Sequence, residues 1–128
     1  MLLLDTDVVV DIFRGHLPAL RWLRSLDNAS LGLPSPVVME VTQGCRDMRQ
    51  VRDIDRRLAR FQIYWPTAAD CDRALAFFGK RHLSHKLGIL DALIGECAVG
   101  LDVPLCTFNV RHFRAVAGLT TEQPYERV

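Results

Sequence analysis

Short apolar runs alternate with longer segments of helical periodicity along this chain, and this alternation restricts its fold more than any other feature. The apolar runs lie at residues 2–4, 31–33, 62–65 and 103–106, and residues 119–128 hold one candidate edge strand. The segments between them repeat apolar residues at the three- and four-residue spacing of a helix face. Strands that alternate with helices form parallel sheets covered on both faces. We therefore predict an α/β fold with a central parallel sheet.

Residues 7–14 carry two competing local signals. Val8, Val9 and Val10 taken alone favour a strand. Asp7 at the start and Gly15 after the end favour a short helix, because acidic residues stabilise a helix N-terminus and glycine commonly follows a C-terminus. We predict the short helix.

Proline and hydroxyl residues mark the starts of the next helices. Pro18 suits the first turn of a second helix that ends near residues 27–28. Ser35 and Pro36 fit the N-cap and first residue of a third helix over residues 36–42.

Two further helices are predicted on either side of the run at 62–65. In the first, over residues 48–61, one face is apolar and another carries arginines; the arginines are Arg49, Arg52, Arg56 and Arg60. These could contact RNA phosphates, but the interspersed aspartates favour a solvated face. In the second helix, Thr67 and Asp70 resemble a capping box. Its predicted apolar face consists of Cys71, Ala74, Leu75 and Phe78.

The composition fits one globular domain over residues 1–128. Hydrophobic residues make up 49% of the 128 residues and charged residues 24%, which is enough to bury a core. The formal net charge of +1 provides no global field toward nucleic acid, so any such contact must be local. No apolar run has membrane-spanning length, and the start lacks the pattern of a signal peptide.

The four cysteines point to a reducing, cytoplasmic setting. They are widely spaced and form no C-x-x-C pair, which argues against a disulfide framework or a zinc site. Cys71, Cys97 and Cys106 have apolar neighbours and are predicted to be small buried side chains.

Four oxygen-bearing side chains lie close to predicted strand ends. Asp5 follows the first strand, Glu40 lies one turn inside the helix after the second, and Asp91 lies near the start of the helix before the fourth. Asn109 follows that fourth strand. In open α/β sheets, ligands bind in the crevice at the carboxyl ends of the strands. We expect these residues to share that crevice.

Such a cluster would favour a hard divalent cation. Neighbouring carboxylates repel one another unless a cation neutralises them, and oxygen ligands favour Mg²⁺ or Mn²⁺ over zinc. One or two such ions could activate a water for phosphodiester cleavage. The plainer alternative is that Asp5 or Asp7 only caps a helix, while Glu40 and Asp91 are solvated surface residues.

Four segments resemble the PIN-domain family, and particularly its VapC-type toxins. The opening LLLDTDVVVD at residues 2–11 resembles the family's first motif, and SPVVMEV at 35–41 holds Glu40 where the family has a glutamate. LDALIG at 90–95 resembles the next motif, and TFNVRHF at 107–113 resembles the last. Each segment is weak alone, but the four in this order are specific.

The resemblance implies a three-layer α/β/α sandwich and Mg²⁺- or Mn²⁺-dependent cleavage of RNA by a type II toxin. It also implies a small VapB-like antitoxin partner and a homodimer. Asp5, Glu40 and Asp91 would bind metal, and Asn109 would take the fourth position. Thr6 and Thr107 would orient ligands or water.

Three positions depart from the family pattern. Asn109 is neutral where many relatives carry Asp, which leaves fewer charges for a second metal. Asp7 stands where Asn is frequent, and it could supply the missing charge. Glu96 replaces a small or hydroxyl residue, and the sequence suggests no role for it.

Two other functions remain open on the sequence. The D-x-D-x-V pattern at residues 5–9 is similar to the opening of haloacid-dehalogenase phosphatases, with Asp5 as nucleophile and Asp7 as acid/base. That family needs a later lysine and a paired acidic motif, and no convincing acidic pair is present. A non-catalytic PIN-like scaffold that binds RNA or a partner is the third hypothesis, and the neutral Asn109 is its best argument.

Overall fold

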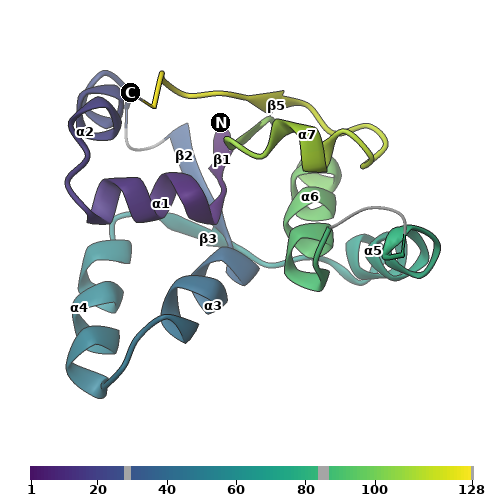
Figure 1. The fold of residues 1–128 in the computed structure, drawn as a ribbon, viewed down its shortest axis with the longest axis horizontal. Coiled ribbons are helices and arrows are strands. Elements are labelled where there is room, and N and C mark those ends of the chain that lie inside the picture. The colour runs from purple at the N-terminus through teal and green to yellow at the C-terminus, as the bar shows by residue number, and fades with distance from the viewer. Residues whose placement is uncertain (28–29, 84–86, 128) are drawn as a thin grey trace.

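The computed structural model describes residues 1–27, 30–83 and 87–127, and its centre is a five-stranded parallel sheet (Figure 1). The strand order is β3-β2-β1-β4-β5, and every neighbouring pair is parallel. The strands are β1 Leu2–Leu4, β2 Leu31–Pro34, β3 Gln62–Tyr64, β4 Leu105–Cys106 and β5 Thr121–Glu122. The predicted parallel sheet and its edge strand are confirmed, although β4 is shorter than the expected 103–106.

Helices flank this sheet on two sides. They are α1 Thr6–Phe13, α2 Leu17–Arg24, α3 Ser35–Gln43, α4 Met48–Leu58, α5 Ala68–Arg81, α6 Ile89–Leu101 and α7 Val110–Phe113. Figure 1 shows α1, α2 and α4 on one side of the strands and α5 and α6 on the other. The predicted α/β/α arrangement is confirmed. None of the helices in the described part of the chain combines the length and apolar character that a membrane crossing needs.

The chain reverses direction across the sheet at β1. It moves outward from β1 to β2 and β3, and then returns to place β4 on the other side of β1. Leu3 pairs with Gly32 on one side and with Leu105 on the other. In open α/β sheets a ligand crevice forms where the strand order reverses. The carboxyl ends of β1 and β4, followed by Asp5 and Thr107, lie at this point.

The valine-rich segment after β1 is helical, as expected. Val8 and Val9 lie on the inner face of α1 and are completely buried in the core, and Asp5 caps the N-terminus of this helix. Gly15 follows the C-cap residue Arg14 with a φ of 72°, a conformation that glycine adopts without steric cost. Burial of one helical face and two end signals together outweigh the strand preference of valine.

The start of α3 differs from the prediction. Pro34, rather than Ser35, is the N-cap residue, and the helix begins at Ser35. The Ser35 hydroxyl is buried and has no hydrogen-bond partner, so it provides no cap. The helix starts one residue early because β2 runs directly into it.

Several predicted burial patterns on the outer helices are wrong. Cys71 is exposed and Leu75 is 73% exposed, and of the predicted apolar face only Ala74 is fully buried. The predicted capping box of Thr67 and Asp70 is present. Helix α4 ends at Leu58 instead of residue 61 and α2 ends at Arg24, while position 28 lies outside the described residues.

Glu96, which had no assigned role, links α6 to α5. Its carboxylate accepts a hydrogen bond of 2.7 Å from Arg73 Nε, and Arg73 Nη2 donates to Asp70 at 2.6 Å. Glu96 and Asp70 are both buried, and the half-exposed Arg73 neutralises them. The ion pair between α5 and α6 therefore explains why Glu96 stands where the family has a small or hydroxyl residue.

Gly32 leaves space for a ring from the neighbouring strand. A Cβ atom at position 32 would lie 2.5 Å from Tyr64 Cε2 and 3.1 Å from Leu3 Cδ2. We expect Gly32→Ala to lower the free energy of unfolding by about 1–3 kcal/mol, because such overpacking forces neighbours to move. Gly79→Ala in α5 is the matched control, since its Cβ would meet nothing within 4 Å. It should be neutral or stabilise by up to about 1 kcal/mol. Equal urea midpoints for the two variants would contradict this account.

Candidate active site

Asp5 stands at the centre of the reversal point and contacts both adjoining segments. Its Oδ1 accepts a hydrogen bond from the Thr6 N–H at 2.8 Å, and its Oδ2 accepts one from the Thr107 hydroxyl at 2.7 Å. Only 2% of the residue is exposed. Burial, with the charge of Asp7, raises the pKa of Asp5 to about 7, although the two hydrogen bonds oppose this shift.

Asp7 and Thr107 join α1 to the segment after β4. Asp7 Oδ2 accepts a hydrogen bond of 2.9 Å from the Phe108 N–H, and its Oδ1 accepts one from Val8. The Thr107 hydroxyl also accepts the Asn109 N–H at 3.0 Å. Burial raises the pKa of Asp7, and the two N–H donors limit the increase. Both residues thus hold the loop after β4 against α1.

Glu40 reaches the same region from α3 and keeps an unused oxygen. Glu40 Oε1 and Thr6 Oγ1 are buried without a hydrogen-bond partner. Burial and the charge of Asp91 raise the pKa of Glu40, and the nearby Thr6 hydroxyl opposes this without being in hydrogen-bond geometry. Buried polar atoms without partners are uncommon and point to a missing ligand, water or ion.

Asp91 is the third residue of α6, as expected. Its carboxylate lies at the helix N-terminus, beside the Gly88 backbone. Burial raises the pKa of Asp91, while the Gly88 N–H and the charge of His112 lower it. The electrostatic influence of Asp91 reaches both Asp5 and Glu40. The structure therefore brings Asp5, Asp7, Glu40 and Asp91 into one mutually repelling group, which we call the acidic cluster.

Asn109 lies beside the acidic cluster, but its side chain is less engaged than expected. It is the N-cap residue of α7, is exposed, and makes no capping bond through its side chain. Sequence analysis missed His112, whose charge acts on Asp91. Its position three residues after Asn109, at the end of a short helix, was the available signal. It also missed Asp11, which is buried one helical turn beyond Asp7.

The sequence matches the PIN domain family over residues 2–119. The chain belongs to the PIN domain family. Ribonuclease VapC10 of Mycobacterium tuberculosis is 32% identical over 115 residues, which cover 88% of this chain and 86% of the relative. This PIN domain is thus homologous to a VapC-type toxin ribonuclease, as the four sequence motifs indicated.

Solved toxin–antitoxin complexes share the fold of this PIN domain. One from Klebsiella pneumoniae aligns with a TM-score of 0.77 and 25% identity, covering 98% of this chain and 99% of that one. VapBC2 from Rickettsia felis, bound to a promoter DNA fragment, aligns with a TM-score of 0.72 and 21% identity over 94% and 96% of the two chains.

The oxygen atoms of this PIN domain's acidic cluster suit a divalent cation. The donors are hard carboxylate oxygens whose repulsion a cation would relieve, and Glu40 Oε1 is buried and unpaired. Among residues 1–27, 30–83 and 87–127, no group of three or more His, Cys, Asp or Glu side chains is arranged to hold a metal ion without further ligands. A bound cation would therefore complete its coordination with water or substrate oxygens, as Mg²⁺ commonly does.

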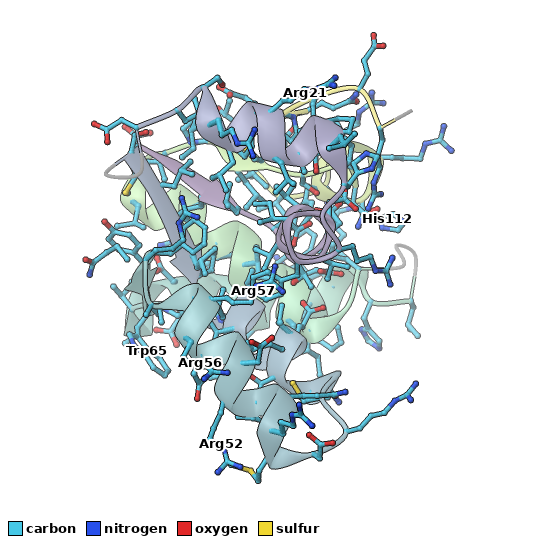
Figure 2. All side chains as sticks on the ribbon, turned by 90° about the vertical axis from the view of Figure 1, so that its left-hand side faces the viewer. Arg21, Arg52, Arg56, Arg57, Trp65 and His112 are labelled. Atoms are coloured by element: carbon cyan, nitrogen blue, oxygen red, sulfur yellow. The ribbon has the colours of Figure 1, made fainter. Side chains whose placement is uncertain are left out.

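A groove of about 960 Å³ runs between α1, α3 and α4 of the PIN domain and includes part of the acidic cluster. Thr6 and Glu40 contribute to its lining; so do Arg14, Arg49, Arg56 and Arg57. Figure 2 shows Arg52, Arg56 and Arg57 on α4. Arg57 donates to the Phe13 carbonyl at 3.1 Å, and Arg56 lies 3.6 Å from Asp53. The arginines of α4 are therefore partly neutralised, as Arg56 is, and partly directed into the groove, as Arg49 and Arg57 are.

The Thr107 hydroxyl should stabilise the fold mainly when Asp5 is ionised, because it donates a hydrogen bond to that carboxylate. We expect Thr107→Val to raise the pKa of Asp5 further, because the hydrogen bond that lowers it is lost. The free energy of unfolding at pH 8 should fall by about 1.5–3 kcal/mol, the usual contribution of a hydrogen bond to a charged group. The loss should be smaller at pH 5. Thr107→Ser keeps the hydroxyl and is the control; equal losses for Ser and Val would assign the effect to packing. Urea denaturation at both pH values measures this.

Proposed function

We propose that this chain is the toxin of a toxin–antitoxin pair and cleaves RNA internally with Mg²⁺ or Mn²⁺ bound at the acidic cluster, where Asp5, Glu40 and Asp91 would bind the ion directly or through water. The observation that carries the proposal is the acidic cluster at the carboxyl ends of β1 and β4, in a chain homologous to a ribonuclease. Three separate segments supply its residues, the start of α1, α3 and α6, so the fold itself gathers the charges.

The side chains of the acidic cluster are held in place to different extents. Asp5 is held by two hydrogen bonds and is therefore preorganised, while Asp91 lies beside the Gly88 backbone at the start of α6. Glu40 Oε1 has no partner and is available to bind a cation or accept a proton from an attacking water. Asn109 is exposed beside the acidic cluster. A bound divalent cation would polarise the scissile phosphate and lower the pKa of the attacking water.

The groove supports an extended, negatively charged substrate. It joins Glu40 and Thr6 to the guanidinium groups of Arg14 and Arg49 within one continuous lining. Arginine pairs well with phosphate, and contacts to the backbone account for much of nucleic-acid affinity. We propose that an RNA strand enters the cluster along this groove.

The antitoxin is a proposal drawn from the relatives, and the homodimer is a proposal drawn from the family resemblance. The solved structures from Klebsiella pneumoniae and Rickettsia felis are toxin–antitoxin complexes. A small VapB-like protein that binds this chain should therefore suppress its activity. Light scattering of the purified chain, alone and with the co-expressed partner, measures both assemblies.

The proposed function is tested with a mixed pool of structured RNA in Mg²⁺, Mn²⁺ or EDTA. We expect internal cleavage in at least one of the two metals and none in EDTA. A phosphatase would instead release phosphate from para-nitrophenyl phosphate and form an aspartyl-phosphate at Asp5. Both carboxylate oxygens of Asp5 are hydrogen bonded and the residue is 2% exposed, which disfavours that nucleophilic role. RNA binding without cleavage in either metal would favour the non-catalytic scaffold.

A further inference from the structure

The segment after β5 returns across the molecule to α1 and α2. Figure 1 shows this segment, in yellow, crossing from β5 to the side of α2. Tyr125 Oη donates a hydrogen bond of 2.8 Å to Asp11 Oδ2. Its ring centroid lies 6.0 Å from that of Trp22 in α2. Residues at the two extremes of the sequence are therefore packed together beside α1.

Arg127 makes a two-pronged contact with the same carboxylate. Its Nε donates to Asp11 Oδ2 and its Nη2 to Asp11 Oδ1, both at 3.0 Å. A paired guanidinium–carboxylate contact fixes orientation as well as distance. Although burial opposes the shift, the hydrogen bonds from Arg127 and Tyr125 lower the pKa of Asp11. Asp11 is thus ionised and paired near neutral pH.

Both residues of this segment also contact Phe108. The Arg127 guanidinium carbon lies 4.6 Å from the centroid of the Phe108 ring. The Tyr125 ring meets the same ring edge-on, with centroids 5.0 Å apart. Phe108 is consequently covered by a cation and an aromatic edge, two contacts that aromatic rings favour.

Phe108 connects these contacts to the acidic cluster. Its N–H donates to Asp7 Oδ2 at 2.9 Å, and it lies between Thr107 and Asn109. Asp7 and Asp11 are one helical turn apart on α1. These contacts form a closed circuit. It runs from Asp7 to Phe108, from Phe108 to Arg127, from Arg127 to Asp11, and back to Asp7 along α1.

We propose that Arg127 and Tyr125 are positioning residues that hold Phe108, and with it the loop after β4, against Asp7 and the acidic cluster. Neither residue contacts Asp5, Glu40 or Asp91 in the described hydrogen bonds and ion pairs. The charge of Arg127 acts on Asp7, and the packing contacts act through Phe108. The effect of Arg127 and Tyr125 on metal binding and cleavage rests on the proposed function, whereas their effect on the position of Phe108 is independent of it.

Because Arg127 is partly exposed, a loss of positioning can be distinguished from a loss of overall stability. Its side chain is 45% exposed, and exposed ion pairs contribute little to stability on their own. Residues that orient metal ligands from a distance typically change metal affinity or activity by about 10–100-fold when they are removed. A positioning role therefore predicts a large functional effect beside a small stability effect.

The test compares Arg127→Ala, Arg127→Lys and Tyr125→Phe with a matched control, Arg73→Ala. Arg73 also pairs with two buried carboxylates, but those carboxylates join α5 to α6. We measure exchange of the Phe108 amide hydrogen by NMR without metal, Mn²⁺ affinity by isothermal titration, and the kcat and KM of RNA cleavage.

Arg127→Ala should accelerate Phe108 exchange and weaken Mn²⁺ binding about tenfold, while KM for RNA changes little. Arg127→Lys keeps the charge without the paired geometry and should recover only part of both. Tyr125→Phe keeps the ring and should act in the same direction with a smaller effect, which preserves the test if Arg127→Ala does not fold. Arg73→Ala should lower the melting temperature and leave Phe108 exchange unchanged.

Unchanged Phe108 exchange and Mn²⁺ affinity in both Arg127→Ala and Tyr125→Phe would overturn the positioning role. If Arg73→Ala alters them as strongly, general loss of stability explains the result and the proposal also falls. If the wild-type protein cleaves no RNA but Phe108 exchange still responds to Arg127→Ala, the proposed function fails and the positioning role stands.

Discussion

Asp5→Asn should make the metal-free protein more stable above pH 7 and at the same time abolish RNA cleavage. The pKa of Asp5 is raised from 3.8 to about 7, chiefly by burial. Ionising this carboxyl therefore destabilises the folded state progressively as the pH rises from about 4 to about 7. Asparagine has the same shape without the charge, so the variant lacks this loss.

The size of the effect follows from the shift in pKa. A shift of about three pH units corresponds to a stability difference of up to about 4 kcal/mol. In EDTA, the free energy of unfolding of the wild-type protein should fall between pH 5 and pH 8, whereas that of Asp5→Asn should change much less. Urea denaturation at four pH values in this interval measures both curves.

Asp53→Asn is the matched control for this experiment. Asp53 lies on the exposed surface of α4, and its side chain is 56% exposed. The control should keep the pH profile of the wild-type protein. A profile for wild type that is as flat as that of Asp5→Asn would show that Asp5 does not carry the buried charge.

Mn²⁺ should reverse the pH-dependent loss of stability in the wild-type protein. A cation that binds only the folded state stabilises it by about 2.7 kcal/mol at one hundred times its dissociation constant. For a chain of this size that corresponds to a rise in melting temperature of roughly 10 °C at pH 8. The rise should be small at pH 5, because protons compete with the metal for the carboxylates.

Glu40→Gln should remove most of this response to Mn²⁺. Its Oε1 is the buried oxygen that has no other partner, and the amide replaces a negative ligand with a neutral one. Differential scanning calorimetry of wild type, Glu40→Gln and Asp53→Asn at pH 8 provides the comparison. An equal rise in all three proteins would place the metal elsewhere and contradict the proposed ligands.

Sequence patterns predicted the elements of the fold that depend on local signals. The run at 2–4, the acidic start and the glycine at position 15 each act within one turn or strand, and α1 formed as expected. Because parallel strands end at the same edge, the positions of Asp5 and Asp91 also followed from the order of the elements. The patterns were less reliable for burial, since Cys71 and Leu75 have helical spacing but lie on the exposed side of α5.

Contacts between distant segments were beyond the reach of those patterns. Arg127 pairs with Asp11 across 116 positions, and Arg73 pairs with Glu96 across 23. No local periodicity encodes such pairs, because they depend on how the segment after β5 and the outer helices pack. The charge effect of His112 on Asp91 also depends on such packing, since α7 is too short to show a hydrophobic face.

The most direct test of the central claim is the rate of RNA cleavage by the wild-type protein and by Asp91→Asn, measured side by side in Mn²⁺ on one pool of structured RNA. Asp91 lies at the start of α6 and acts electrostatically on both Asp5 and Glu40. We expect cleavage by the wild-type protein and a loss of at least about a thousandfold in the variant, which corresponds to about 4 kcal/mol of transition-state stabilisation. Cleavage of equal rate by the two proteins would show that the acidic cluster is not the catalytic centre.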